Sequence, residues 1–225
     1  MIKSLLITML AGMMAMGTVA QESKFTVKGT FENLNDSVIF SLIDVASSAP
    51  IAEQGFAVTG KMVEYSMDLK GGALLSIREA NDNWAKLLLP AIPGESLLVY
   101  QDNTQETHLG GSQFYVDYDQ AEQTVRPILN QLTENMKHQS GEYATMSKEE
   151  AEYYGKQYCA LIEELNEAVV NYVKSHPDQD AAAALLFVLS DDDKVIEQGE
   201  ALLTERARNS TVANLYKAFR TLFKK

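Results

Sequence analysis

Short runs in which apolar and polar residues alternate fill the sequence from Lys24 to about Gly111. In the first run, Phe25 and Val27 share one face of a strand while Lys24 and Thr26 share the other, so one face packs and the other meets water. Gly, Asn, Asp or Pro interrupts the pattern roughly every ten residues, which is typical of antiparallel strands joined by turns. These strands favour a small antiparallel β-sandwich or open barrel. We predict strands over 24–31, 37–44, 53–58, 62–69, 73–79, 84–89 and 95–101.

The apolar period changes from two to about 3.6 residues after Gly110-Gly111-Ser112, and the remaining sequence is typical of helices. Pro127 interrupts the first helical stretch and should kink or break it, because proline removes a backbone donor. Ser147 and Glu150 form a capping-box pattern that starts the second helix, which should end near Pro177. The first two helices most simply pack as an antiparallel hairpin. Three shorter helices are predicted near 178–189, 191–207 and 210–224.

The fold class predicted from these patterns is α+β, with a C-terminal helical bundle following the β-sandwich or barrel. The expected boundaries are 1–20 for a signal peptide, 21–111 for the antiparallel β domain and 112–225 for the helical domain. Because no Gly/Ser-rich or Pro-rich linker separates the two patterns, we expect the modules to pack on each other. Tyr118 and Val125 of the first helix should then be partly covered by strands.

The first twenty residues have the features of a secretory signal peptide. Lys3 gives a positive start, Leu5 to Met16 is apolar, and Ala20 is a small residue suited to cleavage. We expect a mature chain that is exported, periplasmic or associated with the cell envelope, with no later membrane span. An uncleaved membrane anchor is the alternative, although the apolar run is shorter than the roughly 20 residues of a membrane span.

Acidic residues dominate the charge of the chain. Its 225 residues have a formal net charge of −12, and loss of Lys3 with the signal peptide would make that charge more negative. Such a chain repels nucleic-acid phosphates and anionic lipids, so we expect neither as a partner. After Glu205 every charged residue is basic, and we expect these bases to pair with the acidic helices before them rather than to form a docking surface.

The chain has one cysteine, Cys159, which rules out an internal disulfide, a Cys-x-x-Cys redox pair and a cysteine zinc site. Its position at the edge of an apolar helical stripe predicts a half-buried structural thiol, with a reactive or intermolecular thiol as the alternative. His108, His138 and His176 stand far apart, with no second ligand at helical or hairpin spacing. We therefore predict no metal, cofactor or catalytic site.

Two further groups of residues have both an ordinary and a functional interpretation. Asp191-Asp192-Asp193 clusters carboxylates as a cation site would, but Ser190 as N-cap with acids in the first turn explains the run. Trp84 and Tyr100 are the candidate binding surface. Trp84 offers a stacking platform for a sugar or peptide, although burial in the core is the commoner role of tryptophan in small β domains.

Several short segments resemble one family of exported bacterial proteins. Together they are similar to the uncharacterised β-rich domain, with its helical extension, that precedes the thioredoxin-like module in thiol-disulfide proteins of certain Gram-negative bacteria. Full-length members carry a Trp-Cys-x-x-Cys site in the thioredoxin fold, and no position of this sequence matches it. The resemblance therefore implies a Gram-negative cell envelope and assigns no catalytic residue. The segments are Phe25–Phe31, Gly60-Lys61, Leu87–Glu95 leading into Leu97–Tyr100, Gly110–Ser112 and Tyr172–Asp178.

The expected function is that of a non-catalytic binding or scaffold protein of the periplasm or cell envelope, with a protein partner. The alternative that follows from the resemblance is an accessory module, which would position a thioredoxin-like partner or its substrate for thiol-disulfide exchange in trans. An enzyme on the β scaffold would instead require an acid-base pair brought together by folding, which sequence spacing does not reveal.

Overall fold

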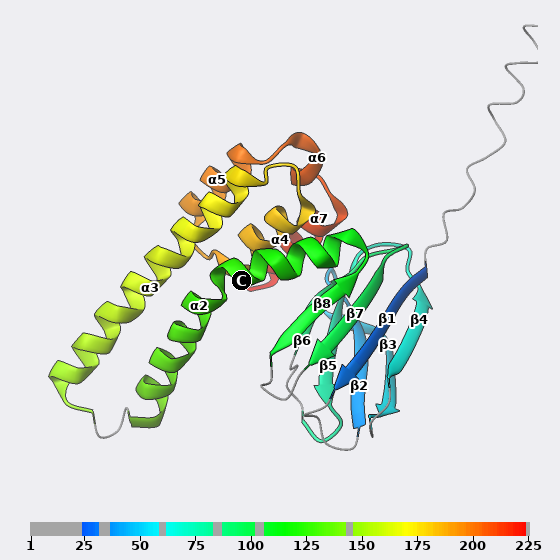
Figure 1. The fold of residues 1–225 in the computed structure, drawn as a ribbon, viewed down its shortest axis with the longest axis horizontal. Helices are drawn as coiled ribbons and strands as arrows, with labels where there is room; N and C mark the ends of the chain where they lie inside the picture. Colours follow the sequence, from blue (N-terminus) through cyan, green and yellow to red (C-terminus); the bar gives the residue numbers. More distant parts are fainter. Residues whose placement is uncertain are drawn as a thin grey trace, which may run out of the picture.

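A computed structural model describes residues 24–31, 37–58, 62–82, 87–101, 106–142 and 146–223 (Figure 1). Strands occupy the N-terminal part of the chain and helices the C-terminal part, which confirms the α+β class. The expected signal peptide and Trp84 lie outside the described residues. None of the helices within the described ranges is long and apolar enough to cross a membrane.

The described residues contain eight strands, arranged in two four-stranded sheets. Sheet A has the order β4-β1-β7-β8, and sheet B has the order β3-β2-β5-β6. Neighbouring strands are antiparallel except β1 and β7, which are parallel. The strands are β1 (Lys24–Phe31), β2 (Ser37–Asp44), β3 (Ala49–Ala57), β4 (Val63–Asp68), β5 (Ala73–Glu79), β6 (Leu87–Ala91), β7 (Ser96–Gln101) and β8 (Thr107–Gly111).

The core of the sandwich lies between the apolar faces of the two sheets. Phe25, Val27 and Phe31 of β1 are buried, as the alternation in the sequence predicts. The ring of Phe40 from sheet B meets the ring of Phe31 from sheet A edge to face, with centroids 5.9 Å apart. Phe40 also lies 6.3 Å from the ring of Tyr65 on β4. Aromatic contacts of this kind add to the area that both sheets bury, so these rings hold the sheets together.

The predicted bounds of β1, β2 and β5 are correct, whereas β3 begins four residues before the predicted start at 53. The added residues follow a turn in which the Asp44 carboxylate accepts hydrogen bonds from the N–H groups of Ala46 and Ser47. Ser48 completes this turn with a positive φ of 56°. Side-chain bonds of this type create a turn without glycine or proline, which explains why the sequence pattern misses it.

The edge strands β8 of sheet A and β6 of sheet B both differ from the prediction. β8 is not among the seven predicted strands, because its two glycines are typical of a junction and its order comes from pairing with β7. The predicted strand 84–89 is observed as β6, which continues through Pro90 to Ala91. Proline is tolerated there because β6 is the edge strand of sheet B. No described strand lies on its outer side, so a backbone N–H at this position is not needed for a sheet hydrogen bond.

The first two helices are long and form the predicted antiparallel hairpin. α2 stays helical through Pro127 and bends along its length in Figure 1, so the proline does not end the helix. α3 begins with the predicted capping box, in which Ser147 Oγ accepts from the Glu150 N–H and the Glu150 carboxylate accepts from the Ser147 N–H. The helices are α2 (Gln113–Glu142), α3 (Lys148–Ser175), α4 (Asp180–Leu189), α5 (Asp193–Leu202), α6 (Glu205–Arg208) and α7 (Thr211–Phe223).

The far end of the hairpin forms an arm, residues 130–142 and 146–161, that extends away from the other helices in Figure 1. Asn135 is buried where the two helices meet, and its amide donates to the carbonyl of Tyr154 at 3.2 Å. The buried residues of α3 are Leu165, Val169 and Val173, which all belong to its second half. The first half of α3 packs on α2 alone, so much of its predicted apolar stripe is exposed.

The two modules share one core, as predicted from the short junction. Tyr115 at the start of α2 is fully buried and donates its hydroxyl hydrogen bond to the carbonyl of Pro90 in β6 at 2.7 Å. Asp119 of α2 accepts a hydrogen bond from the Leu109 N–H of β8 at 2.9 Å. Tyr118 is buried as well, as expected for the first turns of this helix. The side chains of α2 therefore cover the open edge of β8 and close one side of the sandwich.

Three predictions about the helical half are wrong. Cys159 is exposed, because it lies on the arm where no third element covers α3. The predicted helix 191–207 is two helices, α5 and α6. Ser190 ends α4, and its hydroxyl donates to Asn166 of α3 at 3.0 Å, while Asp192 is the N-cap of α5 and accepts from the Lys194 N–H.

Candidate functional site

An exposed apolar face covers the outer side of sheet A around Tyr100. Strand register places Tyr100 beside Thr30 of β1 and opposite His108 of β8. In the next row, Leu98 lies beside Lys28 and opposite Gly110. Because alternate residues of a strand point to the same side, these two rows stand next to each other on the outer surface. We call the surface formed by Lys28, Thr30, Met62, Leu98, Tyr100, His108 and Gly110 the tyrosine face.

The tyrosine face is a shallow hollow of about 400 Å³ whose apolar side chains are open to solvent. Met62 is 63% exposed, Tyr100 46% and Leu98 45%. The rings of Tyr100 and His108 stack with centroids 6.5 Å apart and an interplanar angle of 24°. Gly110 has no side chain to fill the space beside Leu98, so the hollow continues across the strand pair. A continuous apolar surface of this kind marks a binding region more often than scattered exposed residues do.

Polar residues bound the tyrosine face along the sheet. Lys28 and Glu64 form an ion pair at 3.1 Å, and both side chains are at least 40% exposed, so the pair adds little stability. One row further on, the hydroxyls of Thr26 and Ser66 share a hydrogen bond of 2.9 Å. Beside these polar pairs, Leu98, Tyr100 and Met62 form the apolar part of the surface. An apolar centre with a polar rim is the arrangement found in protein interfaces.

Of the two residues in the predicted binding surface, Tyr100 lies on the exposed face of sheet A, and Trp84 is outside the described residues. Leu98, Met62 and His108 belong to the face without having been selected from the sequence. One signal was available for Leu98, since Leu97, Leu98 and Val99 are consecutive apolar residues and one of the two strand faces must then be apolar outside the core.

The three histidines occupy separate places in the described structure. His138 stacks on Tyr154 in the arm, with ring centroids 5.4 Å apart. His176 stacks on Tyr172 at 4.2 Å, and its backbone N–H caps the end of α3. No group of three His, Cys, Asp or Glu side chains among the described residues is arranged to hold a metal ion.

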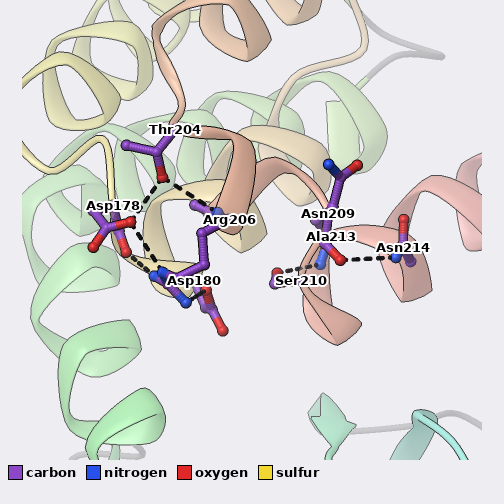
Figure 2. A network of polar contacts seen from close by, with 9 residues as sticks. Asp178, Asp180, Thr204, Arg206, Asn209, Ser210, Ala213 and Asn214 are labelled. Atoms are coloured by element: carbon purple, nitrogen blue, oxygen red, sulfur yellow. Dashed lines mark hydrogen bonds and ion pairs between the residues drawn. The ribbon is translucent and has the colours of Figure 1, made fainter.

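The basic residues after Glu205 that the structure describes make contacts within the molecule, as predicted. Arg206 of α6 binds Asp178 and Asp180 at 2.9 Å each, and Thr204 donates to the Asp178 carboxylate at 2.7 Å (Figure 2). The hydrogen bond from Thr204 and the contact with Arg206 lower the pKa of Asp178, whereas burial raises the pKa of Asp180 despite the same arginine. Lys217 of α7 continues the pattern by pairing with Glu200 of α5 at 2.5 Å.

Comparisons with known proteins do not identify the chain. A scan against protein-family models found no match, and a search of curated proteins found none either. The resemblance to the domain that precedes thioredoxin-like modules thus rests on the short segments quoted above.

Proposed function

We propose that the protein is an exported binding protein of the cell envelope that holds a partner protein on the tyrosine face. The observation that carries this proposal is the exposure of Met62, Leu98 and Tyr100 side by side on an ordered sheet. Water contact with such side chains costs roughly 25 cal/mol for each Å² of apolar surface, so a partner that covers them gains that amount. Because the backbone of the sheet is already ordered, little conformational entropy is lost on binding.

A protein fits this face better than a small molecule does. The hollow is open and spans β1, β7 and β8, with Met62 just before β4, whereas small ligands favour concave sites that enclose most of their surface. An aromatic ring with a polar tip, such as Tyr100, is also common in the centres of protein interfaces. The acidic net charge of −12 favours a partner whose apolar patch is flanked by basic residues.

The resemblance found in the sequence suggests which partner to try first. A thioredoxin-like protein of the same cell envelope, or a substrate of such a protein, would make this chain an accessory module for thiol exchange in trans. This chain would contribute the docking surface and no redox chemistry, since its one cysteine lies on the arm, away from sheet A in the fold (Figure 1).

Photo-crosslinking from the face tests the proposal. A photoreactive phenylalanine analogue at position 100 should capture one discrete partner in envelope fractions, and the same analogue at Tyr158 is the matched control. Tyr158 is also an exposed tyrosine, at 37%, but lies on the arm. The captured protein is then purified, and its affinity is measured for the wild type, Leu98→Glu and Tyr158→Glu.

We expect Leu98→Glu to weaken binding more than tenfold, because it buries a charge in an apolar contact, and Tyr158→Glu to leave it unchanged. Affinity should also fall with added salt. The proposal is wrong if Leu98→Glu and Tyr158→Glu bind equally well. A purified thioredoxin-like envelope protein, titrated in the same way, tests the narrower choice of partner.

Export is tested separately by the intact mass of the mature protein. Cleavage after Ala20 should leave a chain that begins at Gln21 in the envelope fraction. A mass that retains Met1 would contradict the export part of the proposal and would leave the binding part untouched.

A further inference from the structure

A second hollow, which we call the arm hollow, lies between α2 and α3 on the arm that extends away from the other helices (Figure 1). Its volume is about 580 Å³, which falls in the range of small-ligand sites. One face of each helix forms a wall, because the lining residues of each helix recur every three or four positions. On α2 these residues are Asn130, Gln131, Glu134, Asn135 and His138.

The inward-facing positions of the hairpin change from apolar to polar at the arm. On the part of α2 nearer the sandwich, Val125, Ile128 and Leu132 are buried. The next inward position, Asn135, is buried as well but carries an amide. Polar groups at inward positions of a helix pair cost stability unless they are paired or serve a function. The polar walls of the arm hollow therefore need an explanation beyond folding of the hairpin.

Hydrogen bonds within the arm explain part of this polarity. Asn135 donates to the carbonyl of Tyr154 at 3.2 Å, and its own carbonyl oxygen accepts from Gln139 at 2.6 Å. The Gln157 amide donates to the hydroxyl of Tyr153 at 2.7 Å. Asn135 thus joins the two helices, and Gln157 fixes the orientation of Tyr153. These bonds order the walls before any ligand arrives, which lowers the entropy lost on binding.

Other groups of the arm hollow have no such role in the fold. Asn130 and Gln131 are exposed, and their amides bond no other described residue. Tyr153 is 58% exposed, so much of its ring is open to solvent. Because the Tyr153 hydroxyl accepts from Gln157, its own hydrogen remains available to a ligand.

The chemistry of these groups matches a saccharide. An amide offers both a donor and an acceptor, as a hydroxyl does, so an amide-rich wall suits a ligand with several hydroxyl groups. The face of an aromatic ring is negative and attracts C–H groups. A sugar ring carries hydroxyl groups around its edge and C–H groups on its faces, so it can meet the amides and the Tyr153 ring at the same time.

Other ligand classes fit the arm hollow less well. No described residue of its lining is Lys or Arg, the residues that recognise phosphate and sulfate groups. The aliphatic residues of the lining, Ala160 and Leu161, are too few for an alkyl chain or for a docked amphipathic helix, which needs an apolar groove. Both walls are helices whose backbone groups bond internally, so an extended peptide finds no strand edge to pair with.

We propose that the arm hollow binds a neutral saccharide. One sugar ring stacks on Tyr153, and its hydroxyl groups bond the amides of Asn130, Gln131 and Gln157. This site is separate from the tyrosine face, because no residue lines both hollows. The arm would then bind a sugar while sheet A holds a partner protein.

A panel of probes tests the class of ligand. The purified protein is titrated calorimetrically with neutral di- and trisaccharides, including cellobiose, maltotriose and N,N′-diacetylchitobiose, at pH 8, where histidine is ordinarily neutral. A sulfated disaccharide and a proline-rich peptide, which docks in aromatic-lined grooves, are the competing probes. We expect one or more of the neutral sugars to bind at least tenfold more tightly than either competitor. Saturation-transfer NMR should then show the strongest transfer at C–H protons on one face of a sugar ring.

The stacking contact is tested at Tyr153. Tyr153→Ala removes the ring and should abolish both binding and the saturation transfer. Tyr153→Phe keeps the ring and should bind within about threefold of the wild type. The matched control is Tyr158→Ala, which removes another exposed tyrosine of the arm that does not line the hollow and should change nothing.

The amide contact is tested at Gln131. Gln131→Ala should weaken the best neutral sugar about tenfold, because the lost amide both donates and accepts. Gln120→Ala makes the same change at an exposed position of α2 outside the hollow and should leave the affinity unchanged. A cooperative thermal transition checks that each variant is folded, which we expect because Gln131 and Gln120 are both exposed.

The proposal fails if no neutral sugar of the panel binds, or if the sulfated disaccharide or the proline-rich peptide binds as tightly as the best one. It also fails if folded Tyr153→Ala binds like Tyr158→Ala, or if Gln131→Ala binds like Gln120→Ala, because the sugar would then occupy another place. These results are independent of the tyrosine face, since none of the substituted residues belongs to it.

Discussion

The fold changes the ionisation of Glu122 on α2. Burial raises its pKa, and Asp119 raises it further, while Arg126 lowers it only in part. Tyr118 and Tyr216 also face this group. Burial raises the pKa of both hydroxyls, and the Glu122 carboxylate raises it further. The folded state therefore binds the Glu122 proton more tightly than the unfolded state does.

The raised pKa of Glu122 predicts that the free energy of unfolding depends on pH, and Glu122→Gln should remove this contribution. Because the folded pKa lies above the ordinary value of 4.5, the contribution of Glu122 to the free energy of unfolding falls as the pH rises from 4.5 through the folded pKa. The glutamine variant should thus gain stability relative to the wild type between pH 4 and pH 7.5. Urea unfolding at both pH values measures the difference, and an unchanged difference would show that Arg126 fully compensates the burial.

Two helical glycines make a matched pair with opposite predictions. A Cβ on Gly199 of α5 would lie 2.5 Å from Cδ1 and 2.7 Å from Cδ2 of Leu186, which is fully buried in α4. Gly199→Ala should therefore cost about 1–3 kcal/mol by overpacking. Gly155 of α3 has no atom within 4 Å of such a Cβ, so Gly155→Ala should gain about 0.5–1 kcal/mol. Chemical denaturation of both variants gives the signs, and two stabilised variants would mean that α4 and α5 are loosely packed.

At the scale of elements, the arm decides the fate of Cys159. The apolar stripe along α3 predicts that this thiol is half-buried. Within the arm, however, only α2 among the described elements packs against α3, and the thiol is exposed. Cys159→Ser should consequently change the free energy of unfolding by no more than about 0.5 kcal/mol. Native Cys159 should react with a maleimide as fast as the unfolded protein does. Strong protection of the native thiol would contradict an exposed arm.

The strands and helices follow from the sequence where local rules act alone. The alternation in β1 and the capping box at Ser147 set their elements correctly. β8 does not follow, because Gly110 and Gly111 have little preference for a strand and only the partner β7 orders them. Ser190 was likewise assigned to the wrong helix, since its hydroxyl bonds Asn166 in α3, which is distant in the sequence. The errors lie where tertiary contacts override local preference.

The candidate sites are less predictable than the elements. Tyr100 could be selected because it is a large aromatic residue in a strand, but its exposure depends on which face of sheet A the helices leave open. The hollow where the two modules meet is lined by residues of four elements, β6, β8, α2 and α4. No spacing within the sequence links Glu106 with Glu122, since the two meet at Arg126 only after the edge of β8 lies against the helix.

At the scale of the whole molecule, the shared core predicts one unfolding transition. Tyr115 bonds Pro90 and Asp119 bonds Leu109 across the junction, so each half loses buried contacts when the other is removed. Fragments 21–111 and 112–225 should each be less stable than the intact chain, which should melt in one step. Tyr115→Phe should cost about 1 kcal/mol by leaving the Pro90 carbonyl unpaired. Differential scanning calorimetry checks both, and two independent transitions would rule out a shared core.

The place of β1 inside sheet A has a consequence for the order in which the chain folds. β1 is the first described strand, yet its neighbours are β4, with Thr26 opposite Ser66, and β7, with Thr26 beside Ser96. A chain that emerges with its N-terminus first therefore presents Phe25 and Val27 without either partner until β7 has been made. Contacts that span so much sequence form slowly. Completion of sheet A must therefore wait until most of the β-rich half has been synthesised, and β1 stays without its sheet partners until then.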